Sequence, residues 1–302
     1  MTWGSIFLND TNSINQETCK LCGLCAEVCP MKIMIKKGAG GISFRQDRLP
    51  LCMKCGQSMA ICPTQSFIVK GLSYAKDFFE MSDPIAPDIV FFNLIATRRA
   101  IRNFKDRPVP KELLEKIVQA MTFAPPGFTP IKTEITVIQD TEIIRKALPY
   151  MIKVYDGLVK AMNNPIARLF IRQNVGSAKY KTIKNHVVPL MKSRLPELKL
   201  GVEDTITRYA PAMILFHADR NEENHETDIH IALTYGFLAA HVLGLGGSAM
   251  DLIPPAIQNN RELKRMFSIP EGNMVVGSMI LGYPKYRYQR GIKRELKSVS
   301  WI

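Results

Sequence analysis

The stretch CKLCGLCAEVCP, residues 19–30, decides the fold of the N-terminal part of this chain. Its spacing, C-x-x-C-x-x-C-x-x-x-C-P, is typical of cubane [4Fe–4S] ligation, in which three thiolates of a tight loop bind one cluster and the fourth binds another. A second stretch, CMKCGQSMAICP at residues 52–63, has the same spacing with serine in the third place. Two such stretches predict a module with two iron–sulfur clusters.

Closely spaced cysteine pairs also bind structural zinc, so a pair of zinc sites is the alternative. A closed zinc site needs four ligands, whereas the first stretch places three cysteines within seven residues and then adds Cys29 before Pro30. All seven cysteines fall between Cys19 and Cys62, which argues against disulfides spread through a secreted fold. The pattern favours thiolate ligands in a reducing compartment, and therefore a cytoplasmic protein.

The two stretches resemble those of the bacterial two-cluster ferredoxins over about residues 15–70. By position, the resemblance implies that each cluster takes ligands from both stretches. One set is Cys19, Cys22, Cys25 and Cys62, and the other is Cys29, Cys52, Cys55 and Ser58. Serine oxygen is a harder and more basic ligand than a thiolate, so the second site is expected to hold a serine-ligated cubane, a three-iron [3Fe–4S] cluster or a labile cluster.

The bulk properties are those of an ordinary globular protein. The 302 residues are 46% hydrophobic, which suffices for a small domain and a medium one. No apolar run approaches the roughly 18–20 residues that a bilayer span needs, and the opening MTWGSIFLND lacks a signal-peptide pattern. We therefore expect a soluble protein without a membrane partner.

The formal net charge of +13 raises the question of nucleic-acid binding. Much of the excess lies in residues 145–199, where apolar residues have helical spacing and no zinc-finger, helix-turn-helix or RNA-binding signature occurs. A solvated helix face is the favoured interpretation, ahead of a docking surface for an acidic electron donor and of nucleic acid. We predict no nucleic-acid partner.

The chain changes character near residue 85. Before this point, KKGAGGISF (residues 36–44) predicts a hairpin of two short strands that turns at Gly38, Gly40 and Gly41. The prolines within residues 83–87 predict a linker. We place a ferredoxin-like iron–sulfur domain at 1–80 and a second domain at 85–302.

The second domain mixes amphipathic helices with apolar strands in no regular βαβ order. A helix is predicted at 111–123, started by Pro110 and stopped by the prolines that follow it, and an apolar helix is predicted at 229–245. A strand is predicted at 134–140, and buried strands are predicted at 211–219 and 273–284. These elements define an α+β fold, a mixed sheet covered by helices.

A basic run, RRAIRNF at residues 98–104, is followed by APPGFT at residues 124–129. The two segments resemble the FMN-dependent nitroreductase family, which opens with R-R-S-x-R-x-F and has A-P-S-G-x-N after its first helix. The resemblance covers about residues 90–295 and implies a nitroreductase-like FMN domain. Arginine suits this cofactor because it binds phosphate with bidentate, charge-assisted hydrogen bonds and stabilises negative charge on the reduced ring.

The resemblance implies FMN contacts from four parts of the second domain. Arg98 and Arg99 are expected at the phosphate and ribityl side, and Arg102 nearer the ring. The implied contacts are Arg98, Arg99, Ala100, Arg102, Pro125, Pro126, Gly127, Thr129, Ser248, Ala249, Met250, Asp251, Leu252, Arg290 and Arg294.

The chain departs from the family pattern at three of these positions. Ala100 stands where the family has serine, so one side-chain hydrogen bond to the phosphate is lost. Pro126 and Thr129 stand where the family has serine and asparagine, so the wall of the pocket over the flavin is altered. These differences leave the substrate preference open.

The resemblance implies an oxidoreductase in which FMN N5 carries the hydride and no side chain is catalytic. We expect electrons from a low-potential donor, a ferredoxin or flavodoxin, to pass through the clusters to FMN and on to a small organic acceptor of nitro, quinone or activated alkene type. A homodimer is also implied, and the apolar helix at 229–245 is compatible with a subunit contact. Two alternatives stay open: direct reduction of FMN by NAD(P)H, and a non-catalytic redox sensor or electron-transfer module.

Overall fold

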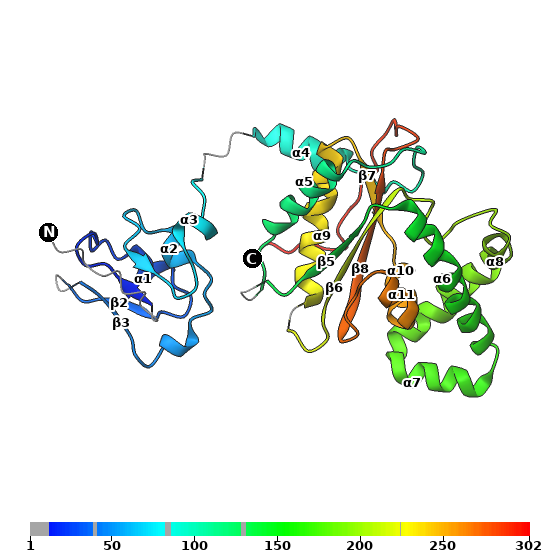
Figure 1. The fold of residues 1–302 in the computed structure, drawn as a ribbon, viewed down its shortest axis with the longest axis horizontal. Helices are drawn as coiled ribbons and strands as arrows, with labels where there is room; N and C mark the ends of the chain where they lie inside the picture. Colours follow the sequence, from blue (N-terminus) through cyan, green and yellow to red (C-terminus); the bar gives the residue numbers. More distant parts are fainter. Residues whose placement is uncertain (1–11, 39–40, 82–85, 128–130, 224) are drawn as a thin grey trace. The chain divides into compact units, whose positions relative to one another are not determined.

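The computed structural model describes residues 12–38, 41–81, 86–127, 131–223 and 225–302, and it divides into two compact units (Figure 1). The first unit is Met1–Ile85 with the short segment Pro126–Ile131, and the second is Ala86–Pro125 with Lys132–Ile302. The predicted turn residue Gly40, most of the predicted linker and the implied FMN contact Thr129 lie outside the described residues. The domain limits given above, 1–80 and 85–302, stay a prediction.

The first unit is built from short elements. Strand β2 pairs antiparallel with β3, as the glycine-rich hairpin predicts, and β1 pairs with β4 from the far end of the unit. The elements are β1 (Ser13–Ile14), α1 (Leu24–Val28), β2 (Met34–Lys36), β3 (Ile42–Phe44), α2 (Gln57–Ala60), β4 (Phe67–Ile68) and α3 (Tyr74–Asp77), with a 3-10 turn at Leu49–Leu51.

The hydrophobic core of the first unit is small. Among the described residues it contains seven buried apolar side chains, with Met59, Met34 and Phe67 the most deeply buried. A domain of this size buries too little apolar surface to be secure by packing alone, and small natural domains add metal sites or disulfides. The core therefore leaves a stabilising role for whatever the cysteines bind.

The second unit contains a four-stranded sheet in the order β5-β6-β8-β7. The strands are β5 (Glu134–Ile138), β6 (Ala212–Asp219), β7 (Gly246–Ala249) and β8 (Asn273–Gly282). The three strands predicted from the sequence are present as β5, β6 and β8, and the two predicted as buried, β6 and β8, are largely buried. All named strands pair antiparallel. Among the described residues the parallel component of the predicted mixed sheet is limited to one bridge between Ala100 and Gly247.

Helices cover both faces of this sheet (Figure 1). One face carries α5 (Lys111–Thr122) and α9 (His225–Val242), and the other carries α6 (Thr141–Ala161), α8 (Val188–Lys199), α10 (Ile253–Gln258) and α11 (Arg261–Met266). Side chains alternate along β6 because a strand has a period of two: Met213 and Leu215 join one core, and Ile214 and Phe216 join the other. The predicted α+β class is confirmed.

The helix boundaries follow from local chemistry. Helix α5 begins after Pro110, as predicted, and the side chain of Asp140 caps α6 by accepting from the backbone N–H of Glu142. Helix α9 begins four residues before the predicted 229, with acidic Glu226 in its first turn. It ends at Val242 because Gly244 takes a left-handed φ of 74°.

The basic region at 145–199 forms α6, α7 (Pro165–Thr182), a π-helical turn (Ile183–Val187) and α8. Helices α6 and α8 bury apolar side chains against the sheet, whereas none of the described residues of α7 is buried. The basic residues Arg168, Arg172 and Lys179 of α7 are exposed. Leu169 and Phe170 of α7 are also exposed, at 58% and 67%, so the solvated helix face stays a prediction.

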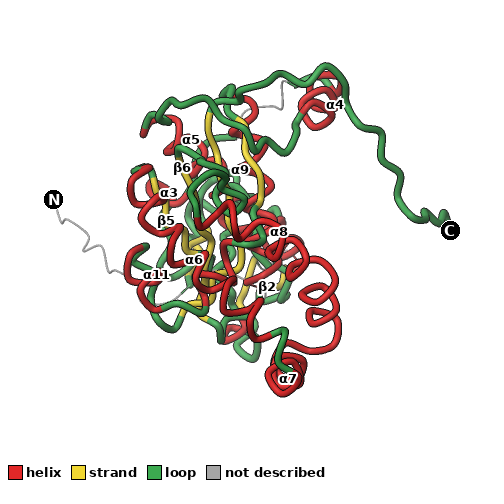
Figure 2. Tube along the Cα trace, turned by 90° about the vertical axis from the view of Figure 1, so that its right-hand side faces the viewer, coloured by secondary structure: helices red, strands yellow, loops and turns green. Residues whose placement is uncertain are grey.

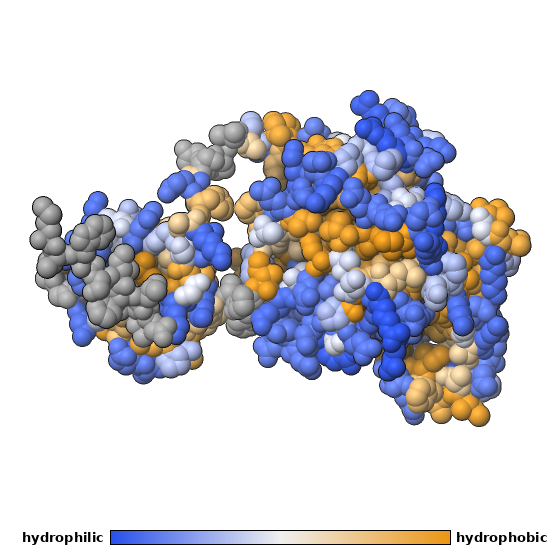
Figure 3. Space-filling model, in the orientation of Figure 1, coloured by the Kyte–Doolittle hydropathy of each residue, from blue (hydrophilic) through white to orange (hydrophobic). Residues whose placement is uncertain are grey.

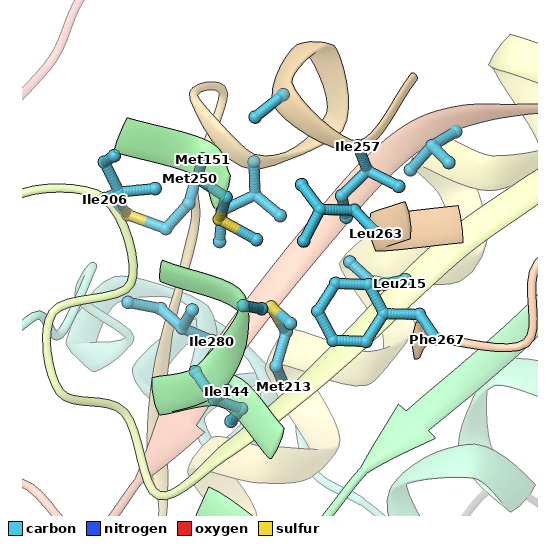
Figure 4. Packing of buried hydrophobic residues seen from close by; sticks show 14 of the residues in the cluster. Ile144, Met151, Ile206, Met213, Leu215, Met250, Ile257, Leu263, Phe267 and Ile280 are labelled. Atoms are coloured by element: carbon cyan, nitrogen blue, oxygen red, sulfur yellow. The ribbon is translucent and has the colours of Figure 1, made fainter. Parts of the chain in front are cut away.

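Phe267 is the largest apolar side chain of the core between the sheet and α6, and it is 1% exposed. Figure 4 shows its ring among the side chains of Met213, Leu215 and Leu263. Phe267→Ala should lower the free energy of unfolding of the second unit by about 3–5 kcal/mol, because the cavity cannot collapse fully. Denaturant unfolding followed by circular dichroism measures this loss.

Leu200→Ala is the matched control, because Leu200 is 78% exposed. Its effect should stay within about 0.5 kcal/mol. Equal losses for the two variants would contradict the packing described here.

Candidate functional site

The cysteines of the first unit line two separate cavities. Each cavity combines three positions of one stretch with the Cys-Pro cysteine of the other stretch. One is lined by Cys19, Cys22, Cys25 and Cys62, and the other by Cys29, Cys52, Cys55 and Ser58. These are the two sets that the ferredoxin resemblance implies.

The thiols of each set line the same cavity but do not converge on a single point. Among the residues that the structure describes, no three Cys, His, Asp or Glu side chains come close enough to hold one metal ion. A structural zinc ion needs four ligands within about 2.0–2.3 Å of a single centre. A multi-iron cluster binds each thiolate through a different iron, so thiols that line one cavity without meeting at one point fit it better than the zinc alternative.

The two stretches adopt the same backbone conformation at an offset of 33 residues. Each has one residue and one glycine with positive φ in its C-x-x-C-G turn, and one more residue with positive φ after its Cys-Pro pair. The pairs are Leu21 (54°) and Lys54 (52°), Gly23 (86°) and Gly56 (75°), and Lys32 (49°) and Gln65 (52°).

Non-glycine residues pay roughly 1–2 kcal/mol each for a left-handed conformation, and such strain collects at functional sites. In this protein, the residues that follow Lys32 and Gln65 donate to sulfur. Ile33 N–H donates to Cys29 Sγ at 3.4 Å, and Ser66 N–H donates to Cys62 Sγ at 3.3 Å.

Burial raises the pKa of the Cys62 thiol, but hydrogen bonds from the backbone N–H groups of Thr64, Phe67 and Ser66 outweigh burial and lower this pKa. Burial raises the pKa of Cys25, so the protein alone favours the thiolate at Cys62 and not at every cysteine.

The second unit has a cavity of about 650 Å³ into which positively charged side chains converge. Arg98 and Arg99 line it, together with the glycine turn Gly244–Gly247 and the segment Pro284–Tyr288. The pKa of Arg98 is lowered, first by burial and then by the charges of Arg294 and Arg99. None of the ion pairs within the described ranges involves these three arginines, so the cavity offers unbalanced positive charge to an anion.

Aromatic rings hold the two lining arginines in place. The guanidinium carbon of Arg98 lies 5.7 Å from the centre of the Phe237 ring, and that of Arg99 lies 5.4 Å from the Tyr288 ring. His241, one helical turn beyond Phe237, lies 2.9 Å through Nε2 from the Thr97 hydroxyl. Burial and the charge of Arg98 lower the pKa of His241, so this ring stays neutral at neutral pH.

The basic run reaches the cavity because it lies along the edge of the sheet. Ile101 N–H donates to the Gly247 carbonyl at 3.0 Å, and Lys105 N–H donates to the Tyr283 carbonyl at 2.8 Å. A Cβ on Gly246 would lie 2.4 Å from the Ile101 side chain, and one on Gly247 would lie 2.8 Å from the Ile280 carbonyl. The glycines of the GLGG turn are therefore needed for close packing against the run.

The other implied FMN contacts are more dispersed. Arg102 lines a smaller cavity of about 240 Å³ with Arg208 and Lys285. In the segment after the glycine turn, Ser248 and Met250 are buried in the protein, whereas Ala249 and Asp251 are exposed. Ser248, Ala249, Met250, Asp251, Leu252, Arg290, Arg294, Pro125, Pro126 and Gly127 do not line the 650 Å³ cavity.

Several lining residues were not predicted as contacts. Phe237 and His241 lie one turn apart on helix α9, where the apolar sequence indicates only a core position. Lys105, Lys285 and Tyr288 also line the cavity. Tyr286 and Tyr288 alternate with basic residues in the sequence, but a half-buried strand explains this alternation equally well.

Comparison with known proteins assigns a family model to a part of each unit. The model of the nitroreductase family matches residues 95–283, and that of a 4Fe–4S dicluster domain matches residues 11–70. This chain belongs to the nitroreductase family and is an oxidoreductase of the type that this family defines, extended by an iron–sulfur domain. No helix in the described parts of the chain is long and apolar enough to span a bilayer.

A curated relative from Methanothermobacter thermautotrophicus, a putative NADH dehydrogenase/NAD(P)H nitroreductase, is 27% identical over 63% of this chain and 75% of its own length. Two nitroreductases solved with bound FMN share the fold. The Bacteroides fragilis protein has a TM-score of 0.53 at 15% identity, over 72% of this chain and 100% of its own. The Desulfitobacterium hafniense protein has a TM-score of 0.52 at 18% identity, over 70% and 97%.

The contact between Gly246 and Ile101 makes a direct prediction. Gly246→Ala should lower the thermal midpoint of the second unit, because the added methyl group overpacks the edge of the sheet at a cost of about 1–3 kcal/mol. Gly157→Ala in α6 is the matched control, since a Cβ there meets nothing within 4 Å. It should raise the thermal midpoint, because replacing a glycine inside a helix by alanine stabilises the protein by about 0.5–1 kcal/mol. If both substitutions stabilise the protein, Ile101 does not require a glycine at 246.

Proposed function

We propose that this chain is an iron–sulfur flavoprotein oxidoreductase that passes electrons from a low-potential donor, through clusters in the first unit and FMN in the second, to an organic acceptor. The observation that carries the proposal is the cavity where Arg98 and Arg99 point unbalanced charge inward, in a chain that also has two cysteine-lined cavities. When bound, FMN accepts single electrons and gives hydride from N5, so it links the two kinds of redox partner.

Arg98, Arg99 and Arg294 are proposed to hold the FMN phosphate. Burial, and then the charges of Arg294 and Arg99, lower the pKa of Arg98. A dianionic phosphate would offset this repulsion through charge-assisted hydrogen bonds. Gly246 and Gly247 let the backbone approach closely on the same side. Ala100, Arg102, Ser248–Leu252, Pro125–Gly127, Thr129 and Arg290 remain proposed FMN contacts on the family resemblance alone.

The first unit is proposed to bind the clusters through the two four-residue sets that share a cavity. The N–H donors to Cys29 and Cys62 stabilise thiolate charge and would tune cluster potentials. Thiolates of this kind persist in a reducing compartment, so we propose the cytoplasm. A ferredoxin or flavodoxin is the proposed donor, and a nitro, quinone or activated alkene compound the proposed acceptor.

A second candidate donor is NAD(P)H, favoured by the name of the Methanothermobacter relative. Steady-state turnover of a nitroaromatic or quinone with reduced ferredoxin, NADH or NADPH separates the two. The first proposal expects ferredoxin to support the fastest turnover.

A homodimer is proposed from the surface of the second unit. Helix α4 (Asp88–Thr97) exposes a run of apolar side chains, including Phe91 and Phe92 at 51% and 60%, and apolar patches are visible on this unit in Figure 3. Every residue from Lys285 to Ile302 is exposed, and Figure 2 shows the C-terminal end of the chain extending away from the body of the unit. Exposed apolar surface of this extent marks an interface.

Arg98→Ala should weaken FMN binding about 10- to 150-fold, because a charged hydrogen bond contributes about 1.5–3 kcal/mol. Titration of the apoprotein with FMN, followed by flavin fluorescence, measures the change. Arg172→Ala on α7 removes an equal charge from an exposed helix and should leave the affinity unchanged. A loss shared by both variants would show a general effect of net charge, and binding of FAD in place of FMN would remove the assignment.

Removal of residues 1–80 should leave a domain that still binds FMN and is still reduced by dithionite. Its reduction by reduced ferredoxin should be lost, because the proposed route runs through the cysteine-bound clusters. Flavin absorbance during anaerobic mixing follows both reactions. Equal rates for the truncated and full chains with ferredoxin would contradict the route.

A further inference from the structure

We propose that the cavity of Cys29, Cys52 and Cys55 holds a three-iron [3Fe–4S] cluster, because Ser58 leaves its fourth corner without a ligand. The inference rests on the cluster sites of the proposed function and goes beyond them. It assigns different cluster types to the two cavities and gives Ser58 a role other than ligation.

Ser58 occupies the position of a cysteine in an unchanged frame. It follows Cys25 by the same 33 residues that separate the other members of the two stretches. The turns before them match in detail: Ala26 N–H donates to the Gly23 carbonyl at 2.9 Å, and Met59 N–H donates to the Gly56 carbonyl at 2.9 Å. The backbone has therefore not rearranged to bring another group to the corner that the missing thiolate would occupy.

The Ser58 hydroxyl is already engaged elsewhere. Its Oγ donates to the carbonyl oxygen of Cys25 at 3.2 Å. Ligation of iron as an alkoxide would require loss of this proton, which would break the hydrogen bond and set a negative oxygen against the carbonyl oxygen. Ser58 is only 7% exposed, so water would compensate this charge poorly.

The rest of the cavity offers no replacement from the usual hard ligands. Apart from the three cysteines, the residues that line it include no histidine or carboxylate among those described. The side-chain oxygen of Asn12, another lining residue, accepts from the backbone N–H of Lys70 at 2.8 Å. An iron at this corner would lack both a protein ligand and ready access to solvent.

The resulting chemistry balances in iron and in charge. A [4Fe–4S]2+ cluster that gives one electron to an oxidant such as ferricyanide releases its corner iron as Fe2+ and leaves [3Fe–4S]+. The cavity of Cys19, Cys22, Cys25 and Cys62 has four thiolates, so its cluster should withstand the same treatment.

The test compares three full-length proteins, purified anaerobically, reconstituted with iron and sulfide, and treated with ferricyanide. The present sequence should contain about seven irons and show the EPR signal of an oxidised three-iron cluster at about one spin per chain. Ser58→Cys should contain about eight irons and lose this signal. Ser58→Ala should match the present sequence in both readouts, because the hydroxyl does not bind iron.

Other outcomes distinguish a failure of this inference from a failure of the proposed function. If the present sequence keeps eight irons and only Ser58→Ala shows the three-iron signal, the serine is a ligand and this inference is overturned while the proposed function stands. If Ser58→Cys retains the three-iron signal, position 58 is not the fourth corner. If none of the proteins takes up iron and sulfide, the cluster sites of the proposed function fail as well.

Discussion

The site in the second unit depends on one close contact, that of the segment Arg98–Phe104 with the edge of the sheet at Gly246 and Gly247. No side chain fits between them, since a Cβ at Gly246 would overlap Ile101. The same constraint recurs at Gly282, where a Cβ would lie 2.5 Å from Pro211. Because the backbones meet, the two arginines at the start of the segment are delivered to the cavity beside the glycine turn.

Charge then gives the cavity its selectivity. The guanidinium groups of Arg98, Arg99 and Arg294 repel one another, and burial makes the repulsion more costly for Arg98. Such an arrangement is unfavourable for folding alone, and it is relieved by an anion that accepts several hydrogen bonds at once. Phe237 and Tyr288 lie against the two lining arginines, at 5.7 Å and 5.4 Å from ring centre to guanidinium carbon, and such contacts favour the charged side chains at the cavity.

The sites of the first unit depend on a different feature, a strained turn that occurs once in each cysteine stretch. Four non-glycine residues, Leu21, Lys32, Lys54 and Gln65, hold positive φ at matching places in the two stretches. With a core of few buried side chains, the unit has little packing energy to hold such strain. Bound clusters would supply that energy, which ties the stability of this unit to its cofactors and makes the single replacement at Ser58 consequential.

The sequence by itself determined the chemistry of both units. The spacing of Cys19–Pro30 and Cys52–Pro63 predicted iron–sulfur ligation, and the ferredoxin resemblance implied the two ligand sets. Periodicity predicted the strands around 212–219 and 273–282, because alternating burial is a local property of the sequence. Only the tertiary structure decided which charges face one another. Phe237 and His241 join Arg98 although they lie more than a hundred residues away in the chain, and the segment 248–252 proved to be partly buried in the protein and away from the cavity. Such contacts depend on how the helices and the sheet pack, and no local pattern of residues records that packing.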